Sequence, residues 1–185
     1  QGICSYDYRT EDFTRYRIKG NTKDDVCFLN TSDGMLLAAC SNGLYRYNEQ
    51  DSLFVPFLLN EEKPHVRYLA EDRDKTLWID TNKGLMRYSL EKKQFVSLPT
   101  LIQPFAQQCN NAVLISSNQL LLNTNSDFFV YHIQSNTLCN LSKDLEVKDF
   151  RCASTDYTGN IWVGTEYGIF VFNKLYQLIA HYEQS

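Results

Sequence analysis

The sequence predicts an all-β fold: a β-propeller segment of four-stranded antiparallel blades, about four and a half of them in 185 residues. A glycine followed by a hydrophobic residue recurs every 41 to 43 residues. Further hydrophobic columns keep a fixed distance from that glycine in each repeat. The segments between these columns read as short β-rich runs separated by polar turns. The repeat glycine pairs are Gly2-Ile3, Gly43-Leu44, Gly84-Leu85 and Gly168-Ile169.

The gap between Gly84 and Gly168 is twice 42 residues, and its midpoint falls at Asp127-Phe128. Four residues after each anchor stands an aromatic residue: Tyr6, Tyr47, Tyr88, Tyr131 and Phe172. Eleven residues after each anchor an apolar residue returns: Phe13, Phe54, Phe95, Leu138 and Ile179. Six residues before the anchor the column reads Leu37, Trp78, Leu121 and Trp162. Such filled columns indicate one structural unit repeated along the chain.

Each repeat holds four expected strands, A to D. In the second repeat they are strand A at 66–69, strand B around Trp78, strand C after Gly84 and strand D around Phe95. Residues after the glycine alternate between apolar and polar, as half-buried strands do. Helical repeats would need apolar residues three and four positions apart, which the tryptophan and glycine segments lack. A helix fits only Leu175, Leu178, Ile179 and Tyr182, and a terminal strand D explains those equally well.

The phase of the repeat predicts the blade organisation within a single propeller segment, 1–185. Residues 1–18 supply only the outer half of a blade, strands C and D. Full blades are expected at 19–60, 61–102, 103–145 and 146–185. We therefore expect a fragment of a larger propeller. Its open edges or faces would associate with another copy or stay exposed.

Composition excludes several classes of function. The net charge of -4 and the scattered basic residues argue against nucleic-acid binding. No run of 18 apolar residues occurs, so no membrane contact is expected within this segment. The six cysteines are dispersed without metal-ligand spacing, so we expect neither a metal site nor a cofactor. We expect free thiols buried as small hydrophobic groups, although an even count permits disulfides.

Two segments carry a family resemblance. Residues 77–88 (LWIDTNKGLMRY) and 161–172 (IWVGTEYGIFVF) resemble the two-component-regulator propeller repeat, which runs roughly W-I-G-T-x-x-G-L-x-x-Y. The resemblance extends over nearly the whole chain through successive repeats. Three departures weaken individual blades: Asp80 replaces a glycine, Leu37 replaces the tryptophan, and the third repeat, 120–131, lacks the motif glycine.

The resemblance implies a sensory role. Such repeats build the periplasmic sensor region of Bacteroides-type hybrid two-component systems, whose parent proteins are anchored in the inner membrane and carry a histidine kinase. Related sensors are receptors for oligosaccharides, so the implied partners are an oligosaccharide and the rest of the parent sensor. No kinase part lies in this chain, and no enzyme activity is expected of it.

The residues themselves assign the repeated columns to the scaffold. Buried aromatic side chains dominate the energetics of protein cores, so both tryptophans are expected to pack inside. The Asp-rich turns at 72–75 and 156–160 resemble the Asp-box of sialidases, itself a folding element, and are expected to be solvated turns. No catalytic constellation is present in the sequence.

Ligand contacts are therefore expected in the variable loops between strands B and C, and between D and A. The ligand-binding candidates are Asn42, Asn82, Lys83, Asn125, Glu166 and Tyr167. The leading hypothesis is a sensor module for oligosaccharides. The alternative is a non-enzymatic propeller scaffold for protein–protein interaction or dimerisation. A glycan-processing propeller enzyme is a third, weaker reading.

Overall fold

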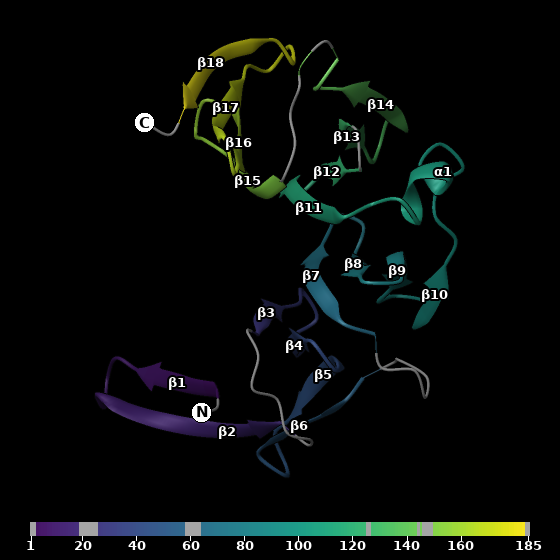
Figure 1. Cartoon of the computed structure of the whole chain (residues 1–185). Coiled ribbons are helices and arrows are strands. Elements are labelled where there is room, and N and C mark those ends of the chain that lie inside the picture. Colours follow the sequence, from purple (N-terminus) through teal and green to yellow (C-terminus); the bar gives the residue numbers. More distant parts are fainter. Residues whose placement is uncertain are drawn as a thin grey trace. The chain divides into compact units, whose positions relative to one another are not determined.

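The fold is given by a computed structural model, which describes residues 3–18, 26–57, 64–124, 127–143, 145 and 150–183 (Figure 1). The described chain forms strands β1 to β18 and one short helix, α1 (Gln103–Ala106). It divides into two compact units, residues 1–69 with 81–83 and residues 70–80 with 84–185.

The described strands assemble into one six-stranded and three four-stranded sheets. The first sheet, ordered β1-β2-β6-β5-β4-β3, contains β1 (Ile3–Asp7), β2 (Asp12–Ile18), β3 (Cys27–Asn30), β4 (Leu36–Cys40), β5 (Gly43–Asn48) and β6 (Leu53–Pro56). The second sheet, ordered β10-β9-β8-β7, contains β7 (Val66–Glu71), β8 (Thr76–Thr81), β9 (Gly84–Ser89) and β10 (Gln94–Val96).

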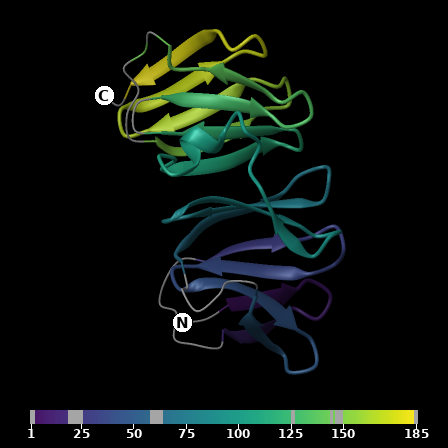
Figure 2. The same cartoon turned by 90° about the vertical axis from the view of Figure 1, so that its right-hand side faces the viewer.

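The third sheet contains β11 (Asn111–Ser116), β12 (Gln119–Asn123), β13 (Phe128–His132) and β14 (Thr137–Asn140). The fourth contains β15 (Phe150–Thr155), β16 (Ile161–Thr165), β17 (Gly168–Phe172) and β18 (Leu178–Glu183). Strands of the third and fourth sheets lie side by side in Figure 2. This confirms the all-β propeller segment with four-stranded antiparallel blades. The segment that also fitted a helix is the strand β18.

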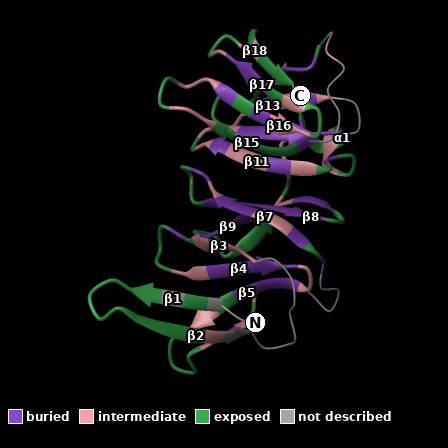
Figure 3. Ribbon diagram, turned by 60° about the vertical axis from the view of Figure 1, so that its left-hand side comes forward, coloured by how far each residue is buried: buried purple, intermediate pink, exposed green. Residues whose placement is uncertain are grey.

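The first two strands form the antiparallel pair expected of strands C and D at residues 1–18, with Tyr6 facing Phe13 across the strands. Their attachment to the first sheet is a feature that the repeat does not predict. The end of β2 then pairs in parallel with β6, Arg17 opposite Leu53, so the hairpin extends the first sheet. Figure 3 shows most of the hairpin in the exposed colour.

The third sheet forms without the motif glycine. Its strands β12 and β13 keep the expected register, with Leu121 opposite Val130 and Leu120 opposite Tyr131. The connecting turn is closed by the Thr124 amide, which donates to the Asp127 carbonyl at 2.9 Å. A polar turn therefore replaces the glycine at this position.

Side chains that alternate along the strands fill the cores between sheets. Trp78 and Leu85 of the second sheet join one core with residues of the third sheet, including Leu120, Leu122 and Tyr131. On its other face the third sheet packs against the fourth, and the core there includes Leu121, Val130, Ile161, Val163, Phe170 and Phe172. Strand alternation thus gives the third sheet two buried faces.

The two tryptophans do not share one environment. Trp78 is 1% exposed, as expected, but Trp162 is 38% exposed and stacks on Tyr182 with the ring planes 5° apart. The expectation that Trp162 is a core residue is therefore wrong. Trp162 lies on the expected strand, at the same repeat position as Trp78. The third sheet covers the ring of Trp78, whereas the face of the fourth sheet that carries Trp162 is partly exposed.

All six cysteines are free. Only Cys40 and Cys109 are buried, while Cys4 and Cys152 are exposed. The prediction that the cysteines are buried as small hydrophobic groups is therefore correct for two of the six thiols.

The Asp-rich turns share one hydrogen-bond pattern. The Asp72 carboxylate accepts bonds from the backbone amides of Asp74 and Thr76 and from Trp78 Nε1 at 2.8 Å. Asp156 accepts the equivalent bond from Trp162 Nε1 at 2.9 Å. Each carboxylate closes its own turn and orients the tryptophan that follows, which supports a structural role.

Acid is expected to weaken the turn at Asp156. Hydrogen bonds from the side chains of Thr158 and Trp162, and from Asn160, hold the pKa of Asp156 well below its usual range. The stabilising contribution is therefore present above the unfolded pKa of about 4 and is lost as the pH falls toward the folded value. The free energy of unfolding, measured with urea at pH 7, 4 and 3, should fall less between pH 7 and pH 3 in Asp156→Asn than in the parent chain. An equally steep loss in both would contradict this.

Candidate functional site

The predicted ligand-binding residues that the structure describes lie on turns between strands: β4 and β5, β8 and β9, and β16 and β17. Asn42 is half-buried, and its Oδ1 accepts bonds from Cys40 Sγ and Tyr45 Oη, both at 3.0 Å. Its amide oxygen is therefore used inside its own turn, which favours a structural role for Asn42.

Asn82 and Lys83 occupy the turn between β8 and β9, and both are exposed. Asn82 Oδ1 accepts a bond from the His65 amide at 3.0 Å, and the Asn82 amide donates to the His65 carbonyl at 3.0 Å. The Asn82 side chain thus fastens the turn to the residue just before β7. Asn125 lies outside the described residues.

Glu166 and Tyr167 form the turn between β16 and β17 of the fourth sheet. The Tyr167 side chain is 60% exposed, and its backbone amide donates to Thr165 Oγ1 at 3.1 Å. Glu166 forms an ion pair with Arg151 of β15. An exposed aromatic ring beside a carboxylate and a guanidinium can both stack on a ligand and hydrogen-bond its hydroxyl groups.

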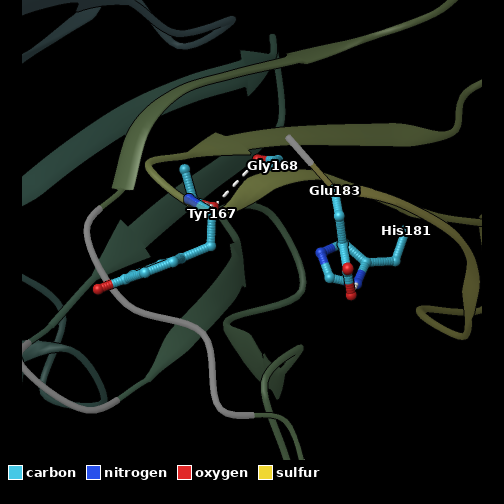
Figure 4. Close-up of polar contacts among 5 residues, drawn as sticks. Tyr167, Gly168, His181 and Glu183 are labelled. Atoms are coloured by element: carbon cyan, nitrogen blue, oxygen red, sulfur yellow. Dashed lines mark hydrogen bonds and ion pairs between the residues drawn. The ribbon is translucent and has the colours of Figure 1, made fainter. Parts of the chain in front are cut away.

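Strand β18 borders this turn. His181 Nδ1 lies 3.7 Å from Glu183 Oε1, and the His181 ring stacks on Phe170 with centroids 4.0 Å apart. In Figure 4 these two side chains lie together on one side of Gly168, and the Tyr167 ring points away from them. Sequence reasoning missed Arg151, His181 and Glu183, because their columns carry no recurring residue type.

Gly168 sets how closely β18 approaches the turn. Its φ is +132°, and a Cβ built on it would lie 2.0 Å from the carbonyl oxygen of Tyr182. Only glycine allows the two backbones to come this close. The motif glycine therefore positions the turn that carries Tyr167.

A polar groove lies elsewhere, on the second sheet. It is lined by Asp74, Thr76, Arg87, Ser89, Glu91, Lys92, Gln94, Phe95, Val96 and Ser97. Arg87 lies over the Trp78 ring at 4.7 Å and donates from Nη1 to the Ser97 carbonyl at 3.1 Å. Its Nε is buried and has no hydrogen-bond partner. The groove mixes hydroxyl, amide and charged groups, so it is a second place where a polar ligand could bind. Sequence reasoning missed it, since its residues come from three different strands and turns.

A polar contact joins the third and fourth sheets. Tyr176, in the turn before β18, contacts His132 Nε2 through its hydroxyl, and Gln119 Nε2 donates to that hydroxyl at 3.1 Å. Burial raises the pKa of Tyr176, so the phenol stays protonated at neutral pH. This contact links the two sheets.

The fold defines the class: a partial β-propeller of four-stranded sheets. Known structures share it. The extracellular domain of a hybrid two-component system from B. thetaiotaomicron matches with a TM-score of 0.68 and 19% identity, over 91% of this chain and 23% of that one. A second such domain from the same organism matches with a TM-score of 0.64 and 19% identity, over 96% and 27%. Virginiamycin B lyase from Staphylococcus aureus matches with a TM-score of 0.67 and 12% identity, over 98% and 62%.

The chain therefore spans about a quarter of the length of the two extracellular domains. Their fold agrees with the propeller-repeat resemblance of residues 77–88 and 161–172. At these identities the likeness shows the fold alone. No family model matches the sequence, and no curated protein does.

Neither a membrane-spanning helix nor a metal-binding cluster occurs among the described residues. No helix there is long and apolar enough to cross a membrane. No group of three or more His, Cys, Asp or Glu side chains in that part of the chain is arranged to hold a metal ion.

Proposed function

We propose that this chain is an extracytoplasmic, non-enzymatic sensor module of a hybrid two-component system, and that it binds an oligosaccharide at the Glu166–Tyr167 turn. The observation that carries the binding proposal is that Tyr167, which is 60% exposed, directly follows the ion-paired Glu166 on the same turn. Aromatic faces stack on the apolar faces of sugar rings, and charged planar groups hydrogen-bond their hydroxyl groups. The propeller-repeat resemblance and the fold shared with two extracellular sensor domains support the sensory role.

The periplasm is the compartment that this proposal requires, with the parent protein anchored in the inner membrane. The oligosaccharide would reach the sensor there, and the remaining parts of the parent would transmit the signal. The likeness to virginiamycin B lyase supports the fold only, so it adds no lyase activity to the proposal.

Calorimetry against a panel of glycan fragments tests the binding site. Tyr167→Ala is expected to weaken binding by about tenfold or more, because it removes the exposed stacking surface. Tyr157→Ala is the matched control, since Tyr157 is fully exposed at the opposite end of β16 and should leave binding unchanged.

Three results would contradict the proposed site. No heat with any glycan would favour the protein–protein scaffold. An equal loss in Tyr157→Ala would show that Tyr167 is not specific. Loss of binding in Arg87→Ala, with Tyr167→Ala unaffected, would move the site to the groove of the second sheet.

A further inference from the structure

The groove of the second sheet gathers hydrogen-bond donors from two neighbouring strands. It has a volume of about 620 Å³, and its lining includes Thr76 of β8 and Arg87 and Ser89 of β9. Arg87 and Ser89 lie on one face of β9, because side chains alternate along a strand. The Leu90 amide donates to the Lys75 carbonyl at 3.0 Å, which holds the end of β9 beside the start of β8. A groove of this volume is large enough for a small polar ligand.

Two hydroxyl groups in this groove are buried and have unused hydrogen-bonding capacity. Thr76 is 6% exposed and Ser89 is 8% exposed. The Thr76 hydroxyl makes no hydrogen bond with any residue that the structure describes. Ser89 Oγ accepts a bond from the Lys92 amide at 3.2 Å, but its own O–H finds no acceptor in the described ranges. Buried hydroxyl groups are normally hydrogen-bonded, so two spare donors in one groove point to an acceptor that binds there.

Arg87 brings further donors to the same place. Its guanidinium lies over the Trp78 ring at 4.7 Å, and Nη1 donates to one backbone carbonyl at 3.1 Å. Its Nε is buried and has no hydrogen-bond partner. Among the described residues, no carboxylate lies within ion-pair distance of Arg87 or Lys92. This includes Asp74 and Glu91, which line the same groove.

The propeller scaffold does not require these donors. In the fourth repeat, Val171 stands in the column of Arg87, and Asn160 stands in that of Thr76. Strands β16 and β17 of that repeat nevertheless form a regular antiparallel pair. In the first repeat, Met35 stands in the column of Thr76. The spare donors are therefore particular to the second sheet, and strand pairing does not account for them.

We propose that this groove binds a small carboxylate ligand that also carries hydroxyl groups, a chemical class that includes the uronic acids. The Arg87 guanidinium donates to the ligand carboxylate as a planar fork. The hydroxyl groups of Thr76 and Ser89 donate to further oxygens of the ligand. The exposed carboxylates of Asp74 and Glu91 accept hydrogen bonds from the ligand hydroxyl groups.

The charges that line the groove favour a singly charged ligand. Arg87 and Lys92 supply two positive charges, and Asp74 and Glu91 supply two negative charges. A phosphate group carries about 1.5 to 2 negative charges at neutral pH, so both carboxylates would repel it. A carboxylate carries a single charge, and its neighbouring hydroxyl groups turn the same two acidic residues into hydrogen-bond partners.

Calorimetry with glucuronate and with glucose tests this site. Glucuronate should bind about tenfold or more tightly than glucose, which lacks the carboxylate. Arg87→Lys keeps the positive charge but loses the planar fork, so it should weaken glucuronate binding by about tenfold. Thr76→Val keeps the shape and removes the hydroxyl, with an expected loss of about tenfold. Arg46→Lys is the matched control, because Arg46 occupies the same repeat column in the first sheet and is exposed.

Several results would overturn the carboxylate site. Glucuronate that gives no heat, or that binds no more tightly than glucose, would do so. So would unchanged glucuronate binding in folded Thr76→Val and Arg87→Lys, with circular dichroism as the check of folding. Inorganic phosphate that binds more tightly than glucuronate, and loses affinity in Arg87→Lys, would show a phosphate site instead.

The groove and the Glu166–Tyr167 turn lie on different sheets, so the two binding sites can be tested separately. Tyr167→Ala should leave glucuronate binding unchanged. Binding of neutral glycan fragments should instead depend on Tyr167 and not on Arg87. Loss of glucuronate binding in Tyr167→Ala would overturn the assignment of the carboxylate to the groove.

Discussion

Replacing Gly168 with alanine should destabilise the protein by about 2 to 5 kcal/mol, because two costs add. The residue has a φ of +132°, a conformation that side chains with a Cβ rarely adopt. The new methyl group would also lie 2.0 Å from the Tyr182 carbonyl oxygen and 3.1 Å from the Glu183 Cα. Strand β18 would have to move away from β17, which breaks the pairing of Gly168 with Glu183. Urea unfolding measured by circular dichroism gives the change in the free energy of unfolding.

Gly34→Ala separates the two costs. Gly34 has a φ of +86°, and a Cβ built there meets no atom within 4 Å. Only the backbone conformation is strained, so the expected loss is about 1 to 2 kcal/mol. Equal losses in the two variants would show that β18 does not approach Gly168 as closely as the structure places it.

Trp78→Ala should cost about 3 to 5 kcal/mol, and Trp162→Ala about 1 to 2 kcal/mol. Both side chains donate from Nε1 to an aspartate, Trp78 at 2.8 Å and Trp162 at 2.9 Å, so both variants lose the same hydrogen bond. The difference in unfolding free energy between the two variants therefore measures how much more of the Trp78 ring is buried. The third sheet buries Trp78 to 1% exposure, whereas Trp162 is 38% exposed.

Guanidinium or urea titrations followed by circular dichroism avoid relying on the fluorescence of the residue that is removed. If Trp162→Ala cost as much as Trp78→Ala under these conditions, the fourth sheet would have a covered face already in the single chain.

The repeat columns were enough to predict the strands and their faces. Spacing from the anchor fixes which side chains share a face, because successive residues of a strand point to opposite sides. Trp78, Leu85, Tyr131 and Leu138 meet as that rule requires. The same spacing placed the strand β13 even though its repeat lacks the motif glycine, since the Thr124–Asp127 turn closes it by hydrogen bonds.

What the columns cannot predict is whether another sheet covers a given face. Trp162 fits the pattern as well as Trp78 does, yet burial depends on a neighbouring sheet that its own strand does not specify. The parallel pairing of β2 with β6 was likewise not predicted, because local spacing says nothing about which edge a hairpin joins.

The candidate site was predicted only in part. The loops that carry Asn42, Asn82 and Glu166 were foreseen as turns between strands B and C. The contacts of Asn82 and Glu166 were not foreseen, because their partners His65 and Arg151 lie just before β7 and on β15. Among the candidates, Tyr167 carries an aromatic ring, and this residue is 60% exposed.

The central claim is that the third sheet covers Trp78, whereas Trp162 at the same repeat position is partly exposed. Acrylamide quenching of single-tryptophan variants tests it most directly. In Trp162→Phe, the remaining Trp78 should be shielded. In Trp78→Phe, the remaining Trp162 should be readily quenched, because it is 38% exposed. Equal quenching of the two tryptophans would contradict the difference in burial between the two sheets.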